Sequence, residues 1–149
     1  MKSTMTLLVV FSLAFISGTK KTSSPSASPL DGEWELVWSS VNGKINTIAK
    51  PNQFKMFHNG FFSLIMKDST GNWTMAAAGT FETTGNVHKE IFRYCSQPNL
   101  IGYTAWQEFE IRGDTLYNRL FTKVVDPTGK DVTNMWTKDL EEKRVRAKR

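Results

Sequence analysis

The chain has 149 residues, 40% hydrophobic and 12% aromatic, a composition that supports one hydrophobic core and excludes wholesale disorder. The formal charge of +5 comes from the two ends, because the stretch from Thr22 to Thr137 holds ten basic and eleven acidic residues. This excludes a basic face for nucleic acid, and a single cysteine, Cys95, excludes an internal disulfide.

The N-terminal segment has the pattern of an export signal. Lys2 precedes the apolar run Leu7–Ile16, which is too short to span a bilayer, and small residues follow it. We expect a signal peptide over residues 1–18, a Ser/Pro-rich linker over 19–29, and no transmembrane segment after signal removal. Thr19 stands where a bacterial lipoprotein carries its lipidated cysteine, so the product is expected to be periplasmic or extracellular without a lipid anchor.

From residue 30 to residue 140, short β-branched and aromatic segments alternate with turn residues, and Asn59-Gly60 is the strongest hairpin signal. The predicted strands are Gly32–Val41, Gln53–His58, Phe61–Lys67, Trp73–Phe81, Val87–Cys95, Tyr103–Arg112, Thr115–Val124 and Val132–Lys138. Eight successive antiparallel strands favour a closed up-and-down barrel, since closure removes exposed sheet edges. The stretch 41–51 is expected to hold at most one helical turn, and residues 141–149 a solvated basic tail.

Hairpin registers predict which side chains point into the barrel. A two-residue turn at Gly85-Asn86 pairs Glu82 with Lys89 on the outside, and the next hairpin points Arg119 outward and Leu120 inward. A β-bulge would reverse such a register. The inward positions, which are the candidate ligand-binding residues, are Ala77, Gly79, Phe81, His88, Glu90, Phe92, Tyr94, Ala105, Gln107, Phe109 and Asn118.

Several ordered motifs resemble a known family. Asp31-Gly32-Glu33-Trp34 contains the Gly-x-Trp that opens lipocalins, and Trp136 with Lys138 resembles the closing segment in which a basic residue covers that first tryptophan. Further matching segments are Pro51–Lys55, His58–Phe62, Gly79–Phe81 and Ile111–Leu116. Together they resemble an uncharacterised lipocalin-like (calycin-type) family of small exported proteins from Gram-negative gut bacteria. The resemblance implies an all-β barrel of eight to ten strands, no established activity, and a structural role in barrel closure for Gly32, Trp34, Trp136 and Lys138.

Small residues on the predicted inner face suggest a cavity. Ala77, Gly79 and Ala105 line up where close-packed interiors rarely place small side chains. Glu90 has two interpretations, a polar anchor for a ligand or a carboxylate satisfied by neighbouring protein groups. Both faces of Phe54–Met66 are apolar, and which of them is interior is left open.

The sequence offers no catalytic constellation. His58 and His88 lie in different hairpins, so no metal site or cofactor is expected. Cys95 is seven residues from His88, which places the two on opposite faces of an unbroken strand. We therefore expect a binding protein and not an enzyme, its partner a small apolar or amphipathic molecule. The alternative is a non-catalytic envelope interaction or structural module with a filled barrel.

Overall fold

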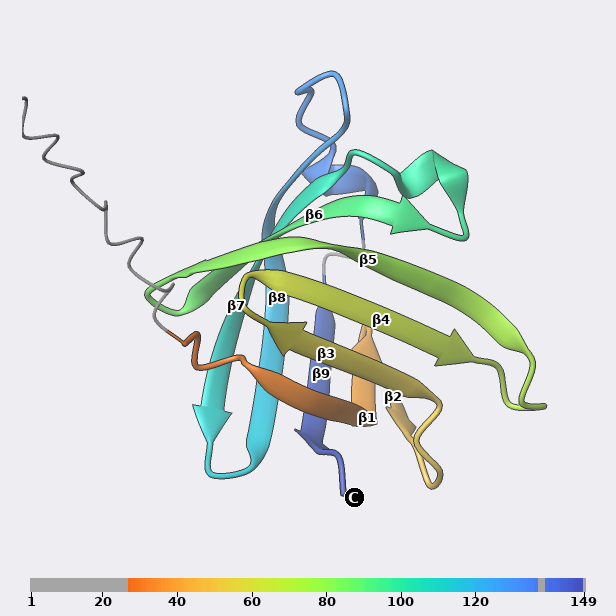
Figure 1. Cartoon of the computed structure of the whole chain (residues 1–149). Coiled ribbons are helices and arrows are strands. Elements are labelled where there is room, and N and C mark those ends of the chain that lie inside the picture. Colours follow the sequence, from red (N-terminus) through yellow and green to blue (C-terminus); the bar gives the residue numbers. More distant parts are fainter. Residues whose placement is uncertain (1–26, 137–138, 149) are drawn as a thin grey trace, which may run out of the picture.

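The structure, a computed structural model, describes residues 27–136 and 139–148, which form an antiparallel β-structure (Figure 1). The expected signal peptide, the first eight linker residues and Lys138 lie outside the described residues. Within this part of the chain, no helix is long and apolar enough to cross a membrane. The strands are β1 (Gly32–Val41), β2 (Lys44–Thr47), β3 (Gln53–His58), β4 (Phe61–Lys67), β5 (Trp73–Thr84), β6 (Val87–Cys95), β7 (Thr104–Arg112), β8 (Thr115–Val125) and β9 (Leu140–Arg146), with short 3-10 helices η1 (Pro98–Leu100) and η2 (Thr133–Met135).

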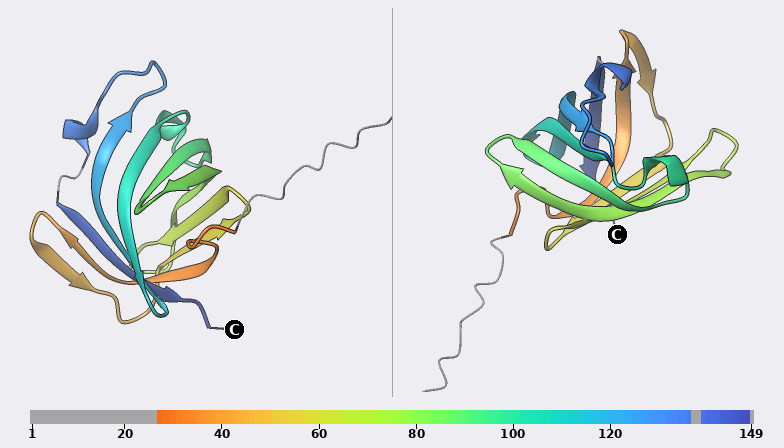
Figure 2. Two further views of the ribbon diagram at one scale, coloured as in Figure 1. Left: turned by 90° about the vertical axis from the view of Figure 1, so that its left-hand side faces the viewer. Right: turned by 90° about the horizontal axis from the view of Figure 1, so that it is seen from above.

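The sheet closes on itself. The strand order is β1-β3-β4-β5-β6-β7-β8-β9, and β9 pairs again with β1, so eight strands form a barrel and β2 is added to β1 as an extra strand. In Figure 1, β3, β4 and β5 run across the view while β7, β8 and β9 run almost upright, and Figure 2 shows the strands surrounding one interior. The predicted all-β, eight-stranded antiparallel barrel is confirmed.

Two predictions were wrong, one on the last strand and one on the stretch that follows the first strand. The last strand is Leu140–Arg146 instead of Val132–Lys138, so residues expected in a solvated tail form part of the wall. The reason is that β9 turns charged side chains, Glu142 and Arg144, toward a polar interior and lacks apolar alternation. The stretch expected to hold at most a helical turn contains β2, and the turn before it uses Asn42 and Gly43 with φ of 50° and 76°.

Trp34 closes one end of the barrel. Its side chain is fully buried, and its indole Nε1 donates a 2.8 Å hydrogen bond to the carbonyl of Leu30. The Arg146 guanidinium lies 3.8 Å from the Trp34 ring centroid and would collide with any side chain at Gly32, where φ is 132°. A basic residue therefore covers the tryptophan as predicted, but it is Arg146. Trp136 packs elsewhere, 5.3 Å from the Phe121 ring.

A β-bulge in β6 changes the predicted register. Glu82 and Lys89 pair at 2.6 Å as predicted, but the pairing shifts so that Gly79 faces Phe92 while Ala78 faces Tyr94. Tyr94 is consequently 73% exposed, so its predicted inward position was wrong. The same bulge turns Cys95 toward the core cluster, on the side where His88 lies, against the expectation of opposite faces.

Irregular pairing of β7 with β8 has a similar effect, because it leaves Leu120 exposed although we predicted it inward. Arg119 is exposed, as predicted. The open question of β3 and β4 is answered by burial, since alternate residues point inward: Gln53, Lys55, Phe57, Phe62 and Leu64.

Candidate functional site

Ten of the eleven candidate positions lie at buried sites of the barrel wall, and only Tyr94 is exposed. Part of the interior is filled with aromatic rings of the core cluster that also contains Trp34. Phe57 meets Phe81 at 4.8 Å between centroids, and His88 lies between Phe57 at 5.9 Å and Phe109 at 5.8 Å. These contacts leave His88 1% exposed.

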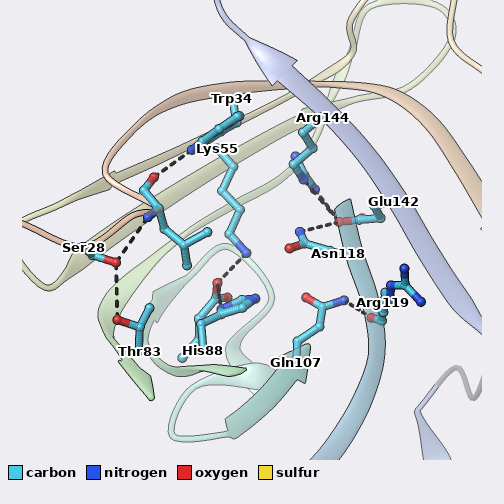
Figure 3. A network of polar contacts seen from close by, with 12 residues as sticks. Ser28, Trp34, Lys55, Thr83, His88, Gln107, Asn118, Arg119, Glu142 and Arg144 are labelled. Carbon is cyan, nitrogen blue, oxygen red and sulfur yellow. Dashed lines mark hydrogen bonds and ion pairs between the residues drawn. The ribbon is translucent and has the colours of Figure 1, made fainter. Parts of the chain in front are cut away.

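A buried ion pair lies beside these rings. Lys55 Nζ is 2.6 Å from Glu90 Oε1, and His88 Nδ1 is 3.2 Å from the same oxygen (Figure 3). Burial raises the pKa of Glu90, but the Lys55 charge and the contact with His88 outweigh it and lower the pKa to about 2. Glu90 is therefore an ionised carboxylate with protein partners, which favours the second of its two interpretations.

A second buried pair joins β9 to the interior. Arg144 Nη2 is 2.9 Å from Glu142 Oε2, and Asn118 Nδ2 donates to Glu142 over 3.3 Å (Figure 3). Arg144 Nη2 also donates to the side-chain oxygen of Gln53. Burial raises the pKa of Glu142, yet the charges of Arg144 and Lys55 hold it below its usual range. Each buried pair joins one cation to one anion, so neither leaves an uncompensated charge for an ionic ligand inside the barrel.

Gln107, another polar candidate, has a local partner, because its Nε2 donates a 2.8 Å hydrogen bond to the Arg119 carbonyl. Two of the three small residues are explained by the fold. Gly79 lies against the Ile91 carbonyl at the bulge, where a Cβ would collide with backbone. Ala105 packs under a cluster that includes Val124. Neither leaves a space for a ligand.

Ala77, the third small residue, lines a hollow. This hollow has a volume of about 450 Å³ and is lined by residues of β4, β5 and β6 together with Ser96 and Ile101, which flank η1. We call it the rim hollow. Its lining residues are Leu64, Ile65, Ala76, Ala77, Ala78, Tyr94, Cys95, Ser96 and Ile101.

A smaller hollow of about 170 Å³ adjoins the first, since Ile65 lines both. We call it the Trp73 hollow. Its other lining residues are Glu35, Pro51, Asn52, Gln53, Phe54, Lys67 and Trp73. Lys67 Nζ lies 4.2 Å from the centroid of the Trp73 ring, which fixes a positive charge on one wall.

Sequence reasoning missed most residues of these sites. Lys55 and Arg144 are the buried cations of the barrel, but one lies in a strand with two apolar faces and the other in the presumed tail. A Lys with alternate apolar neighbours gives no signal of its own, because exposed lysines are the rule. The hollow beside Trp73 depends on how β3 and β4 lie next to β1 and β5, which the local sequence does not encode.

Comparison with known proteins bears on the fold. No family model matches the sequence, and no curated protein sequence is significantly similar. Among solved structures, the chain resembles a lipocalin-like protein from Bacteroides uniformis, with a TM-score of 0.53 and 14% identity over 79% of this chain and 98% of that one. The fold is lipocalin-like. An uncharacterized protein from Bacteroides eggerthii shows the same similarity, with a TM-score of 0.51 and 10% identity over 79% of this chain and 99% of that one.

The structural similarity supports the lipocalin-like architecture, and identities this low carry no assignment of function. The resemblance of the sequence motifs to lipocalin-like proteins of gut bacteria is confirmed at the level of the fold.

Proposed function

We propose that this lipocalin-like barrel binds a small apolar or amphipathic molecule in the rim hollow. The observation that carries the proposal is the hollow itself. Its volume of about 450 Å³ falls in the range of small-molecule sites, which are apolar with a few polar groups, and the hollow is broadly open to solvent. The polar side chains on its walls are Tyr94, Cys95 and Ser96, and Ser96 Oγ already accepts a 2.9 Å hydrogen bond from the Ala76 amide.

The barrel interior is a less favourable place for the ligand. A molecule entering the layer of Lys55 and Glu90 would have to separate a 2.6 Å ion pair that is buried on all sides. Breaking a buried pair leaves an uncompensated charge, which costs about 3–5 kcal/mol. The rim hollow needs no such rearrangement, because Ile65, Tyr94 and Ile101 already stand exposed on its walls.

The place of action is a second part of the proposal. The N-terminal pattern of Lys2, an apolar run and Thr19 supports export to the periplasm or the exterior without a lipid anchor. Amphipathic molecules released from membranes are available in both compartments. The tests of export and of binding are separate, so either part can fail alone.

Cys95 gives a direct test of binding, because the chain's single cysteine lines the rim hollow. Alkylation of its thiol can be followed by mass spectrometry with and without dodecyl-chain amphiphiles. We expect a bound amphiphile to slow alkylation in proportion to occupancy. The probe's affinity should fall in Ile101→Ser but not in Leu120→Ser, a matched control since these residues are 42% and 43% exposed and Leu120 does not line the hollow.

Two results would contradict the proposal. One is unchanged alkylation with every apolar or amphipathic probe, which would favour the alternative of a filled-barrel interaction module. The other is equal loss of affinity in both variants, which would place binding elsewhere on the barrel.

A further inference from the structure

The Trp73 hollow carries opposite charges on separate walls. Glu35 and Lys67 both line it, yet neither makes an ion pair or a side-chain hydrogen bond with another residue in the described part of the chain. Lys67 is instead held over the Trp73 ring at 4.2 Å. The carboxylate and the ammonium therefore keep their capacity to bind a ligand of complementary charge.

The two hollows form one continuous path across the sheet. Phe54 pairs with Ile65, and Ile65 pairs with Ala76, so these three residues form a row over β3, β4 and β5. Directly opposite residues in antiparallel strands share one face. Phe54 lines the Trp73 hollow, Ala76 lines the rim hollow, and Ile65 lines both. One elongated molecule can therefore occupy both hollows across this row.

We propose that the ligand is a single-chain amphiphile with a zwitterionic head group, an inference that rests on the proposed function. Its apolar chain lies in the rim hollow and its head group in the Trp73 hollow, where the cationic part faces Glu35 and the anionic part faces Lys67. The exposed indole of Trp73 carries the Lys67 ammonium over its ring and so holds in place the charge that faces the anionic part.

Charge complementarity favours a zwitterionic head group over an anionic or a cationic one. An anionic head group, as in a fatty acid, would meet Lys67 but would leave Glu35 opposed to a like charge. A cationic head group would meet Glu35 but would leave Lys67 opposed to a like charge. Like charges brought together at a binding site penalise the wrong partner, which is how charged walls produce specificity.

The experiment compares amphiphiles with the same dodecyl chain, each below its micelle concentration. The probes are dodecylphosphocholine, dodecyl phosphate, dodecyltrimethylammonium and dodecyl maltoside, with phosphocholine alone as the probe that lacks a chain. Protection of Cys95 and calorimetry report binding to the full chain. We expect dodecylphosphocholine to bind most tightly and free phosphocholine to bind far more weakly, since the chain supplies the buried apolar area.

Charge-reversal variants then test the two walls. In Lys67→Glu both walls are negative, so the preference should move to dodecyltrimethylammonium, with dodecylphosphocholine weakened by about tenfold. In Glu35→Lys both walls are positive, and the preference should move to dodecyl phosphate. Lys123→Glu is the matched control, because Lys123 also lies over a tryptophan ring, 5.4 Å from the centroid of Trp106, and lines neither hollow.

The outcomes distinguish this inference from the proposed function. If the order of the four amphiphiles is the same in wild type, Lys67→Glu and Glu35→Lys while Ile101→Ser still weakens all of them, the head-group assignment is wrong and the rim hollow remains the site. Equal binding of phosphocholine with and without its chain would also overturn the inference. If no amphiphile protects Cys95, the proposed function fails and the head-group assignment fails with it.

Discussion

Replacing Lys55 by Met tests the buried ion pair, because it removes the charge that lies 2.6 Å from Glu90 and keeps an apolar stem of similar length. The pKa of Glu90 is lowered from 4.5 to about 2, a difference of about 2.5 units. At 1.36 kcal/mol per unit, the native surroundings stabilise the ionised form by about 3 kcal/mol. In Lys55→Met the burial that raises the pKa of Glu90 is opposed by His88 alone, and removal of one partner from a buried pair costs about 3–5 kcal/mol, so we expect a loss of at least about 3 kcal/mol at neutral pH.

The assay is urea denaturation followed by tryptophan fluorescence, at neutral pH and in acid. A carboxyl group with a depressed pKa stabilises the fold above its unfolded pKa of 4.5, and this stability is lost as the pH falls toward 2. The difference between wild type and Lys55→Met should therefore shrink over that interval. Lys89→Met is the matched control, since its pair with Glu82 is equally short but more exposed, and its loss should stay below about 1 kcal/mol. Equal losses in the two variants, or a Lys55→Met difference that is constant with pH, would refute the reasoning.

Three further predictions concern the buried Trp34, Gly79 at the bulge and the N-terminal segment. Trp34→Ala should lose about 3–5 kcal/mol of unfolding free energy, because it empties a fully buried site under Arg146, and an unchanged denaturation midpoint would contradict this. Gly79→Ala should lower the melting temperature markedly, since its Cβ would meet the Ile91 carbonyl, and wild-type melting would show that the bulge relaxes freely. With Thr19 at the lipobox position, cells fed labelled fatty acid should export the protein without label, and label on the protein would disprove the absence of an anchor.

The fold could be predicted because turns and alternation are local signals. Asn59-Gly60 and Gly85-Asn86 fix two hairpins, and the pair of Glu82 with Lys89 follows from the second turn alone. The first hairpin could be predicted without its inner face, because both faces of Phe54–Met66 are apolar. Closure of the barrel followed from the number of antiparallel strands. We predicted that a basic residue near the end of the chain covers Trp34, and the residue that does so is Arg146.

The site could be predicted only in part, because it depends on irregularities and on partners distant in sequence. One extra residue near Arg93 reverses the side of Tyr94, and nothing in the local sequence marks that bulge. Arg144 is buried because Glu142 and Gln53 meet it from β9 and β3, a coincidence that the strand alone does not encode. Ala77 is among the residues that line a hollow, but the cavity inside the barrel that its small side chain suggested stays a prediction.

The most direct measurement of the central claim is a methyl NMR titration of the full chain with dodecylphosphocholine. We expect saturable shifts for the methyl groups of Ile65, Ala77 and Ile101, residues that line the two hollows, and little change at Leu116 and Val124, which are buried elsewhere in the barrel. Shifts centred on Leu116 or Val124 would instead place the ligand inside the barrel, and the absence of any saturable shift would contradict ligand binding at the rim.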